Sequence, residues 1–209
     1  DVLNTIHENF QHIPIRDTFI LQLHRDLYKF ENASNGGRFK TSDNIIEEED
    51  ERGNKFVRFR PLPAWETPDA IINLCTAYNE AINKGEADSL LLIPMFIIDF
   101  LCIHPFDDGN GRLTRTITDM LLARADGMPH RYYSMSAEIL RNKNGYYDAL
   151  ESTTIGDVDI TLWLEWFLQT LKDAMELSVD IVSRVVKKSM FWQEHRDVAM
   201  NERQVKVVN

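Results

Sequence analysis

Apolar residues recur every three or four positions along most of this chain, which is the spacing of an amphipathic helix. Residues 16–31 show the pattern first. A second helix is expected from about residue 67, with Thr67 as its N-cap and Pro68 in its first turn. This helix should run to about Lys84, because Gly85 is a typical residue to end a helix.

The next helix is apolar on nearly every side, which is typical of the central helix of a bundle. It should be capped by Asp88 and Ser89 and should run through Ile103. A further helix is expected from just after Gly111 to near Gly127, and a short one over residues 146–152. A long helix is expected over residues 158–189, with apolar side chains on one side: Trp163, Trp166, Phe167, Leu171 and Met175.

Residues 36–60 depart from the helical pattern. Two β-prone arms, 38–46 and 56–59, flank the acidic run 47–51 and a glycine-containing turn. We therefore predict a β-hairpin over residues 38–60 that stands off a helical body, with the acidic run as its solvated tip.

The composition is that of an ordinary globular domain, with 209 residues, 44% hydrophobic and 27% charged. Disordered, collagen-like and disulfide-scaffold classes are thereby excluded. The longest apolar stretch, residues 90–103, is interrupted by Pro94 and Asp99 and is too short to span a bilayer, so no membrane partner is expected. Cys75 and Cys102 lie in helical apolar patterns, which favours free thiols in a reducing compartment and hence a cytoplasmic location.

The net charge of −10 argues against a general nucleic-acid-coating protein. It does not argue against a nucleotide, because a phosphate responds to local donors more than to the total charge.

Both ends of the chain suggest a piece of a longer protein. The chain starts at Asp1 without a methionine and stops at Asn209 inside a new apolar-periodic segment. A processed natural terminus followed by a fraying tail is the alternative.

The residues that indicate chemistry are 104–115, with the sequence His-Pro-Phe-Asp-Asp-Gly-Asn-Gly-Arg-Leu-Thr-Arg. An apolar helix ends at His104, a tight loop follows over 107–111, and a new helix begins at about Arg112. Glycines in such a loop allow positive φ angles and let N–H groups converge. Because the loop leads into a helix N-terminus, it can form an anion-binding nest.

Charged side chains complete this candidate site. Arg112 and Arg115 share one helix face beyond the loop, where both could bind a polyphosphate. Asp108 offers a carboxylate of the kind that holds Mg²⁺ beside phosphates. His104 has an imidazole that can accept a proton from a hydroxyl near neutral pH. Each feature alone has an ordinary structural explanation, such as a packed histidine, a turn or a solvated ion pair, but their coincidence within twelve residues favours a functional site.

This stretch resembles the signature of the Fic family, His-x-Phe-x-Asp/Glu-Gly-Asn-Gly-Arg-x-x-Arg. All eight fixed positions match: His104, Phe106, Asp108, Gly109, Asn110, Gly111, Arg112 and Arg115. The similarity extends to a flap hairpin over residues 38–63, and to residues 134–139 with Tyr146 and Tyr147 beside an adenine pocket. It also covers residues 159–163, at the start of a helix that closes the bundle.

The resemblance implies a mainly α, Fic-type helical bundle with a β-hairpin flap over the active site. N-terminal helices over residues 1–32 would pack on a Fic core over residues 33–190, with the flap at about 38–60. A C-terminal helix over residues 191–209 would lead to a winged-helix module, the one route by which nucleic acid is expected as a partner.

The resemblance also implies an adenylyltransferase that moves AMP from ATP to a Tyr, Thr or Ser hydroxyl of a target protein. His104 would be the base, Phe106 a buried anchor of the loop, and Asp108 the ligand of Mg²⁺. The flap would bind the target by strand addition, and a homodimer is a further expected assembly.

The nucleotide contacts implied in this way come from the loop, the flap and the segment beside the base. The loop amides and the Asn110 side chain would bind the α- and β-phosphates, and Arg112 and Arg115 would face the β/γ end. Thr154 stands where some relatives have Asn. The full set is Asn44, Ile45, Ile46, Glu47, Asp107, Asp108, Gly109, Asn110, Gly111, Arg112, Arg115, Tyr146, Tyr147 and Thr154.

Many members of the family carry an inhibitory helix with the pattern Ser/Thr-x-x-x-Glu-Gly/Asn. Ser134 to Glu138 matches the Ser/Thr-x-x-x-Glu part of this pattern, but Ile139 follows it and the full pattern does not fit. We therefore expect the inhibitory helix upstream of Asp1.

Three other functions remain open. One is a Fic-type transferase of another phosphate-linked group, although Gly111 disfavours the kinase-like branch, which has Lys there. Another is a nucleotide-binding regulatory module without turnover. The last is a helical domain whose loop binds an adventitious anion.

Overall fold

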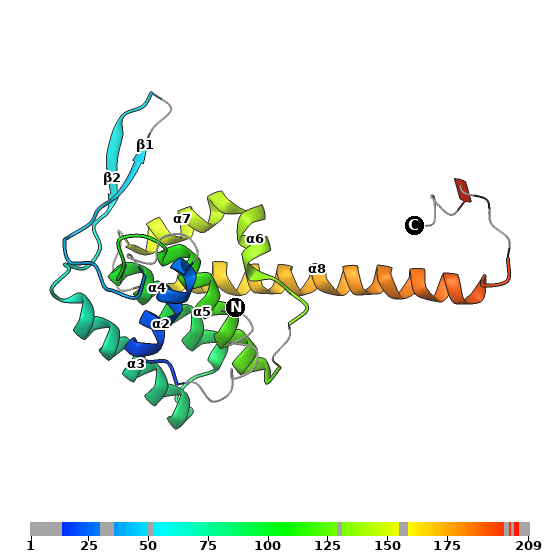
Figure 1. Cartoon of the computed structure of the whole chain (residues 1–209), viewed down its shortest axis with the longest axis horizontal. Coiled ribbons are helices and arrows are strands. Elements are labelled where there is room, and N and C mark those ends of the chain that lie inside the picture. Colours follow the sequence, from blue (N-terminus) through cyan, green and yellow to red (C-terminus); the bar gives the residue numbers. More distant parts are fainter. Residues whose placement is uncertain are drawn as a thin grey trace.

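The computed structural model describes residues 14–29, 36–49, 52–128, 131–154, 159–198, 201 and 203–204. This part of the chain is mainly α, as predicted, and it also contains one two-stranded antiparallel sheet. The helices form one body, and the hairpin and one long helix project from it (Figure 1). The elements in chain order are α2 (Asp17–Tyr28), β1 (Ile46–Glu49), β2 (Lys55–Phe59), α3 (Thr67–Lys84), α4 (Ser89–Ile103), α5 (Asn110–Asp126), α6 (Met135–Arg141), α7 (Lys143–Thr154) and α8 (Thr161–Glu194).

Helix α4 is the centre of the bundle, as its apolar sequence predicts. It packs against α3, α5 and α8, and buried side chains cover most of its circumference. Asp88 is its N-cap and accepts a hydrogen bond from the Leu90 N–H at 2.8 Å. Because α4 is packed on several sides, its end is held in place, and so is His104, which directly follows its last residue Ile103.

The start of α3 differs from the prediction by one residue. Thr67 is the first helical residue rather than the N-cap, which is Glu66. The Thr67 hydroxyl donates to the Pro63 carbonyl at 3.0 Å and does not accept from an N–H of the first turn. It therefore bonds the chain before the helix instead of capping the helix. The predicted end is confirmed, since Gly85 closes the helix in the left-handed conformation.

The predicted hairpin is confirmed, but its first strand lies later than expected. Part of the acidic run forms β1 rather than the tip, and Glu47 is opposite Val57 while Ile46 is opposite Phe59. The ribbon stands off the body, and Phe56 and Val57 on β2 are exposed. Because the ribbon buries neither of these side chains, backbone pairing rather than side-chain polarity decides where its strands run.

The short helix expected at residues 146–152 is the middle of α7, which also includes one further turn before it. Helix α6 was not predicted. Its N-cap is Ser134, whose hydroxyl accepts from the Ala137 N–H at 3.2 Å. Both helices pack against α8.

Helix α8 is longer than its predicted span and extends far beyond the body (Figure 1). Trp163, Phe167 and Leu171 are buried as expected, whereas Met175 is 46% exposed because the body ends near it. Further along, the exposed apolar residues are Leu177, Val179, Ile181, Val182, Val185, Val186 and Met190.

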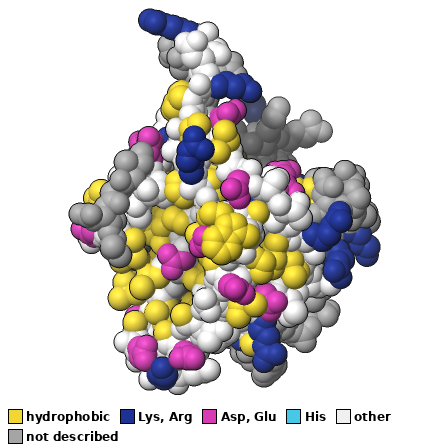
Figure 2. Space-filling view, turned by 90° about the vertical axis from the view of Figure 1, so that its left-hand side faces the viewer, with side chains coloured by type: hydrophobic (Ala, Val, Ile, Leu, Met, Phe, Trp, Pro, Cys, Tyr) yellow, Lys and Arg dark blue, Asp and Glu magenta, His cyan; other side chains and the backbone are white. Residues whose placement is uncertain are grey.

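Apolar side chains also gather on the face of the body below the hairpin (Figure 2). Cys75 and Cys102 are free thiols. Among the described residues, no helix combines the length and apolar character that crossing a bilayer requires. The expectations for residues 1–13, and for most of the segment after residue 198, lie outside the described residues.

Candidate functional site

The site is built where α4 ends and the chain turns into α5. His104 follows the last residue of α4 with φ 48° and ψ 63°, while its N–H still bonds the Phe100 carbonyl at 3.0 Å. Among the described residues it is the one non-glycine residue with a positive φ. Such a conformation costs free energy and turns the chain sharply, so the imidazole is placed at the mouth of the loop rather than on the helix surface.

The loop after His104 is closed by Asn110. The Asn110 side chain accepts from the Phe106 N–H at 3.0 Å and donates to the Phe106 carbonyl at 2.7 Å. It is 2% exposed, and Phe106 itself is fully buried. The Asn110 side chain thus holds the turn of the loop through Phe106, and the expectation that it also binds phosphate stays a prediction. The backbone N–H of Asn110 is a second group that can take that role.

Helix α5 begins directly at this loop. Gly109 precedes it in the left-handed conformation, and the Leu113 N–H makes the first helical bond to the Gly109 carbonyl at 2.9 Å. The N–H groups of Asn110 and Gly111 come before that bond, where a helix carries partial positive charge. This geometry is suited to an anion.

A cavity of about 430 Å³ opens beside this helix end and is roofed by the foot of the hairpin. Eight of the predicted residues line it: Ile45, Ile46, His104, Gly111, Arg115, Tyr146, Tyr147 and Thr154. The cavity thus combines the imidazole, the helix N-terminus and the motif arginine Arg115. Its size is that of a small-molecule site.

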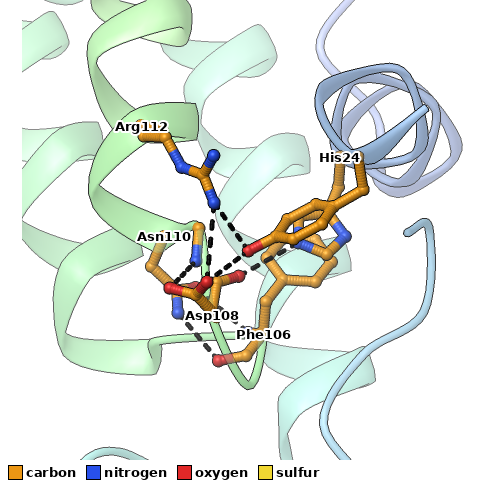
Figure 3. A network of polar contacts seen from close by, with 7 residues as sticks. His24, Phe106, Asp108, Asn110 and Arg112 are labelled. Atoms are coloured by element: carbon orange, nitrogen blue, oxygen red, sulfur yellow. Dashed lines mark hydrogen bonds and ion pairs between the residues drawn. The ribbon is translucent and has the colours of Figure 1, made fainter. Parts of the chain in front are cut away.

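The other predicted residues do not line this cavity. Asp107 and Asp108 line a smaller cavity of about 240 Å³ on the side of the loop that faces α2. Figure 3 shows Arg112 reaching toward Asp108 beside the helix that carries His24. The other residues absent from the lining of the larger cavity are Asn44, Glu47, Gly109, Asn110 and Arg112.

Arg112 and Asp108 meet at Tyr28 of α2. The Tyr28 hydroxyl donates to the Asp108 carboxylate at 2.6 Å and accepts from Arg112 at 2.8 Å. The Arg112 guanidinium also lies over the Tyr28 ring, 5.0 Å from its centroid. Burial and the Asp108 hydrogen bond raise the pKa of Tyr28 to about 12, and the same bond lowers the pKa of Asp108. Asp108 is thus ionised, and Arg112 points to α2 rather than into the larger cavity.

Burial and, to a smaller extent, the nearby Lys40 ammonium lower the pKa of His104 from its usual range to about 4. The Leu101 carbonyl and the Asp108 carboxylate offset part of this effect. Nδ1 is buried and has no hydrogen-bond partner in the described part of the chain. The imidazole is therefore neutral at physiological pH, and one of its two nitrogens is able to accept a proton.

A model of the Fic/DOC family matches residues 14–122, just over half of the chain. The chain belongs to the Fic/DOC family. Membership indicates a transferase of phosphate-linked groups.

Solved structures agree with this fold. A Fic-domain signaling protein from Bacteroides thetaiotaomicron superimposes with a TM-score of 0.69 at 22% identity, covering 89% of this chain and 69% of that chain. A Fic family protein from Desulfovibrio desulfuricans gives 0.65 at 21% identity, covering 85% and 51%. Residues 134–508 of Fic-1 from C. elegans give 0.66 at 14% identity, covering 87% and 50%.

A short stretch is also similar to the ribonucleoside-diphosphate reductase small chain of Ostreid herpesvirus 1. The identity is 39% over 49 residues, which are 23% of this chain and 8% of that protein. The present chain thus spans a small part of that relative and about half to two thirds of the solved ones.

Several residues of this Fic site were not singled out from the sequence. Arg58, Phe59, Leu101, Leu150 and Glu151 line the larger cavity. Glu151 lies one helical turn after Tyr147, so helical spacing alone could have placed it beside the predicted base pocket.

Helix α2 also contributes to the Fic loop in a way that its sequence does not reveal. His24 stacks on Phe106 with ring centroids 3.8 Å apart, and its Nε2 lies 3.1 Å from the Asp108 carbonyl. Nδ1 accepts from the Gly37 N–H at 3.0 Å, which leaves Nε2 as the donor. His24 and Tyr28 share one helix face, but nothing in their spacing says which loop that face meets.

The residues present fit Mg²⁺ only together with a polyphosphate. In the described residues no group of three His, Cys, Asp or Glu side chains could hold a metal ion. Asp108 is an ionised and largely exposed carboxylate next to the loop. Its Oδ1 accepts one hydrogen bond, from the Gly109 N–H, and keeps a second lone pair, whereas Oδ2 accepts from both Tyr28 and Arg112. A single carboxylate with phosphate oxygens and water is a common Mg²⁺ environment.

Proposed function

We propose that this chain is a protein adenylyltransferase that moves AMP from ATP to a hydroxyl side chain of a target protein. The observation that carries the proposal is the cavity in which a neutral imidazole, a helix N-terminus and Arg115 face one another. Family membership and the complete loop motif support it.

In the proposed reaction the hydroxyl oxygen of the target attacks the α-phosphorus of ATP. The new oxygen–phosphorus bond forms as the bond from the α-phosphorus to the bridging oxygen breaks, and pyrophosphate leaves. The His104 imidazole accepts the hydroxyl proton, which it can do because the ring is neutral.

The other groups hold the triphosphate and stabilise its charge. The N–H groups at the start of α5 and the Arg115 guanidinium would bind phosphate oxygens. Asp108 would hold Mg²⁺, which supplies positive charge to the phosphates. Tyr146, Tyr147 and Thr154 would border the base, and the exposed hairpin would receive an extended segment of the target by strand addition.

The test is transfer from ATP and Mg²⁺ to the proteins of a lysate from the source organism. Two labels are used in parallel, one on the α-phosphate and one on the γ-phosphate. We expect transfer of the α-phosphate label and not of the γ-phosphate label. This transfer should occur with the wild-type protein and be absent with His104→Ala. ATP binding by His104→Ala should persist, because this substitution leaves the helix N-terminus and Arg115 in place.

Each other outcome assigns a different function. Label from the γ-phosphate would indicate transfer of phosphate. No label with either, together with ATP binding, would indicate a nucleotide-binding module without turnover. Absence of both label and ATP binding would contradict a nucleotide site altogether.

A further inference from the structure

The segment that leads into the hairpin lies along the end of α4 and bonds the backbone around His104. The Lys40 N–H donates to the Pro105 carbonyl at 2.9 Å. The Lys40 ammonium donates to the Ile103 carbonyl at 3.1 Å. The carbonyls before and after His104 are therefore both bonded by one residue.

Asn44 extends this set of bonds by one residue along the loop. Its side-chain oxygen accepts from the Lys40 ammonium at 3.2 Å, and its side-chain nitrogen lies 3.3 Å from the Phe106 carbonyl. Ile103, Pro105 and Phe106 are thus all held from the same side by Lys40 and Asn44. We call Lys40 and Asn44, with the three carbonyls that they bond, the backbone clamp.

The clamp bonds the backbone at the end of α4, where the helix leaves carbonyls without a helical partner. The last carbonyls of a helix have no helical partner, and a lysine at that end also complements the negative end of the helix dipole. A non-glycine residue in the left-handed region persists only where its surroundings hold it there. The clamp is directly adjacent to such a residue, His104.

Lys40 is an unusual side chain for this role because it is 3% exposed. Burial lowers its pKa, and the Asp43 and Asp107 carboxylates raise it. An ammonium group is costly to bury unless it is hydrogen-bonded, and an apolar side chain of equal length would fill the space without that cost. The two acceptors and the proximity to His104 account for a lysine here.

We propose that Lys40 is a positioning residue for His104, which holds the backbone of the loop through the clamp and brings its ammonium group close to the imidazole. The inference rests on the proposed role of His104 as the base. It adds a residue that lies outside the loop motif.

Other charges also surround His104 and have to be kept constant in any test. They come from the loop (Asp107 and Asp108), from α5 (Arg115), from β2 (Arg58) and from α7 (Glu151 and the Tyr146 hydroxyl). Asp108 raises the pKa of His104, whereas the Lys40 ammonium lowers it, so removing each should shift the titration in opposite directions.

The test compares two substitutions at Lys40. Lys40→Gln keeps a donor but removes the charge, and Lys40→Arg keeps the charge. Lys84→Gln is the matched control, because Lys84 is exposed at the end of α3. The His104 imidazole is titrated by NMR in each folded protein without substrate, and α-phosphate transfer is measured separately.

We expect Lys40→Gln to raise the pKa of His104 and to slow transfer by about tenfold, since the shift of the loop should be smaller than the 1 Å misplacement that costs about 100-fold. Lys40→Arg should retain the low pKa and recover part of the rate, and Lys84→Gln should change neither. If Lys40→Gln fails to fold, Lys40→Arg and the milder Asn44→Ser, which shortens the clamp, provide the comparison in transfer rate.

An unchanged His104 titration in folded Lys40→Gln would overturn the inference. So would a transfer rate equal to that of the wild type. The titration needs no nucleotide, so a shifted pKa in a protein that transfers nothing would support the electrostatic role of Lys40 while the proposed function fails.

Discussion

His104 combines three unusual properties at one residue: a left-handed backbone, a mostly buried ring and a low pKa. The sequence predicted the residue and its place at the end of α4, because the motif and the apolar run both stop there. It did not predict the left-handed backbone of His104 or the neighbouring Lys40 that holds it. Lys40 is 64 positions earlier in the chain and belongs to no motif.

The low pKa of His104 predicts a dependence of stability on pH. In the unfolded chain the imidazole binds a proton at about pH 6.5, whereas in the folded chain it does so only near pH 4. The contribution of His104 to the free energy of unfolding should therefore be fully present above pH 6.5, and it should be lost as the pH drops from 6.5 toward 4.

Denaturant unfolding of the wild type and of His104→Gln at several pH values measures this effect. The variant should lose about 2 kcal/mol less than the wild type between pH 7 and pH 4.5. Because burial also lowers the pKa of His24, both proteins retain some loss, and only their difference is assigned to His104. Parallel curves would contradict a neutral, buried imidazole.

At the scale of single elements, the loop and the hairpin carry the site. The glycines of the motif were predicted to allow positive φ, and Gly109 does so with φ 84°. The reason goes beyond the turn, because Tyr28 of α2 lies against Gly109 so closely that a Cβ there would meet its ring at 2.9 Å. No local pattern in the sequence reveals that neighbour.

Gly109→Ala should therefore be more destabilising than the same change at Gly85. Both glycines have positive φ, but nothing lies within 4 Å of a Cβ at Gly85. The strain of the left-handed backbone should cost about 1 kcal/mol at each position. The clash with Tyr28 should add 1 kcal/mol or more at Gly109 alone, by the usual cost of overpacking.

Denaturant unfolding of the two variants gives the comparison. Equal losses of free energy would contradict a close contact between α2 and the loop.

The hairpin is tied to α7 across the cavity. Arg58 on β2 bonds Glu151 at 2.7 Å, and its guanidinium lies 5.3 Å from the centroid of the Tyr147 ring. The sequence predicted the hairpin from its two β-prone arms but not this contact, since the two residues are 93 positions apart. The tie fixes the roof of the cavity.

Arg58→Met and Glu151→Gln should each speed amide hydrogen exchange in β1 and β2. In a double-mutant cycle the effects should be non-additive, with a coupling of about 0.5 kcal/mol because both side chains are partly exposed. Lys55→Met is the matched control on the same strand, because the ion pair of Lys55 with Glu47 is long, at 3.9 Å, and exposed. Additive effects of Arg58 and Glu151 would mean that the ion pair does not hold the hairpin.

At the scale of the whole molecule, α8 belongs to the body over its first half and projects from it over its second. The continuous helical pattern predicted one long helix, and the structure has one. Periodicity cannot show where packing stops, because exposed Val182 and Val186 continue the same apolar pattern as buried Phe167. Where the body ends depends on α6 and α7, and of these α6 was not predicted.

Stability should therefore respond unequally along α8. Trp163 is 1% exposed and its indole N–H donates to the Pro94 carbonyl at 2.8 Å, so Trp163→Ala should cost about 3–5 kcal/mol. Val186→Ala should change the free energy of unfolding by no more than about 0.5 kcal/mol. Denaturant midpoints with unchanged m-values measure both, and comparable losses would contradict the projection of α8.

The bonds between Asn110 and Phe106 have a thermodynamic consequence for any ligand of the loop. Since the protein's own groups complete the turn, its shape is preorganised and little chain entropy remains to be lost when an anion arrives. ATP should then raise the melting temperature by mass action, as the logarithm of its concentration over its dissociation constant, without the heat-capacity signature of a segment that folds on binding.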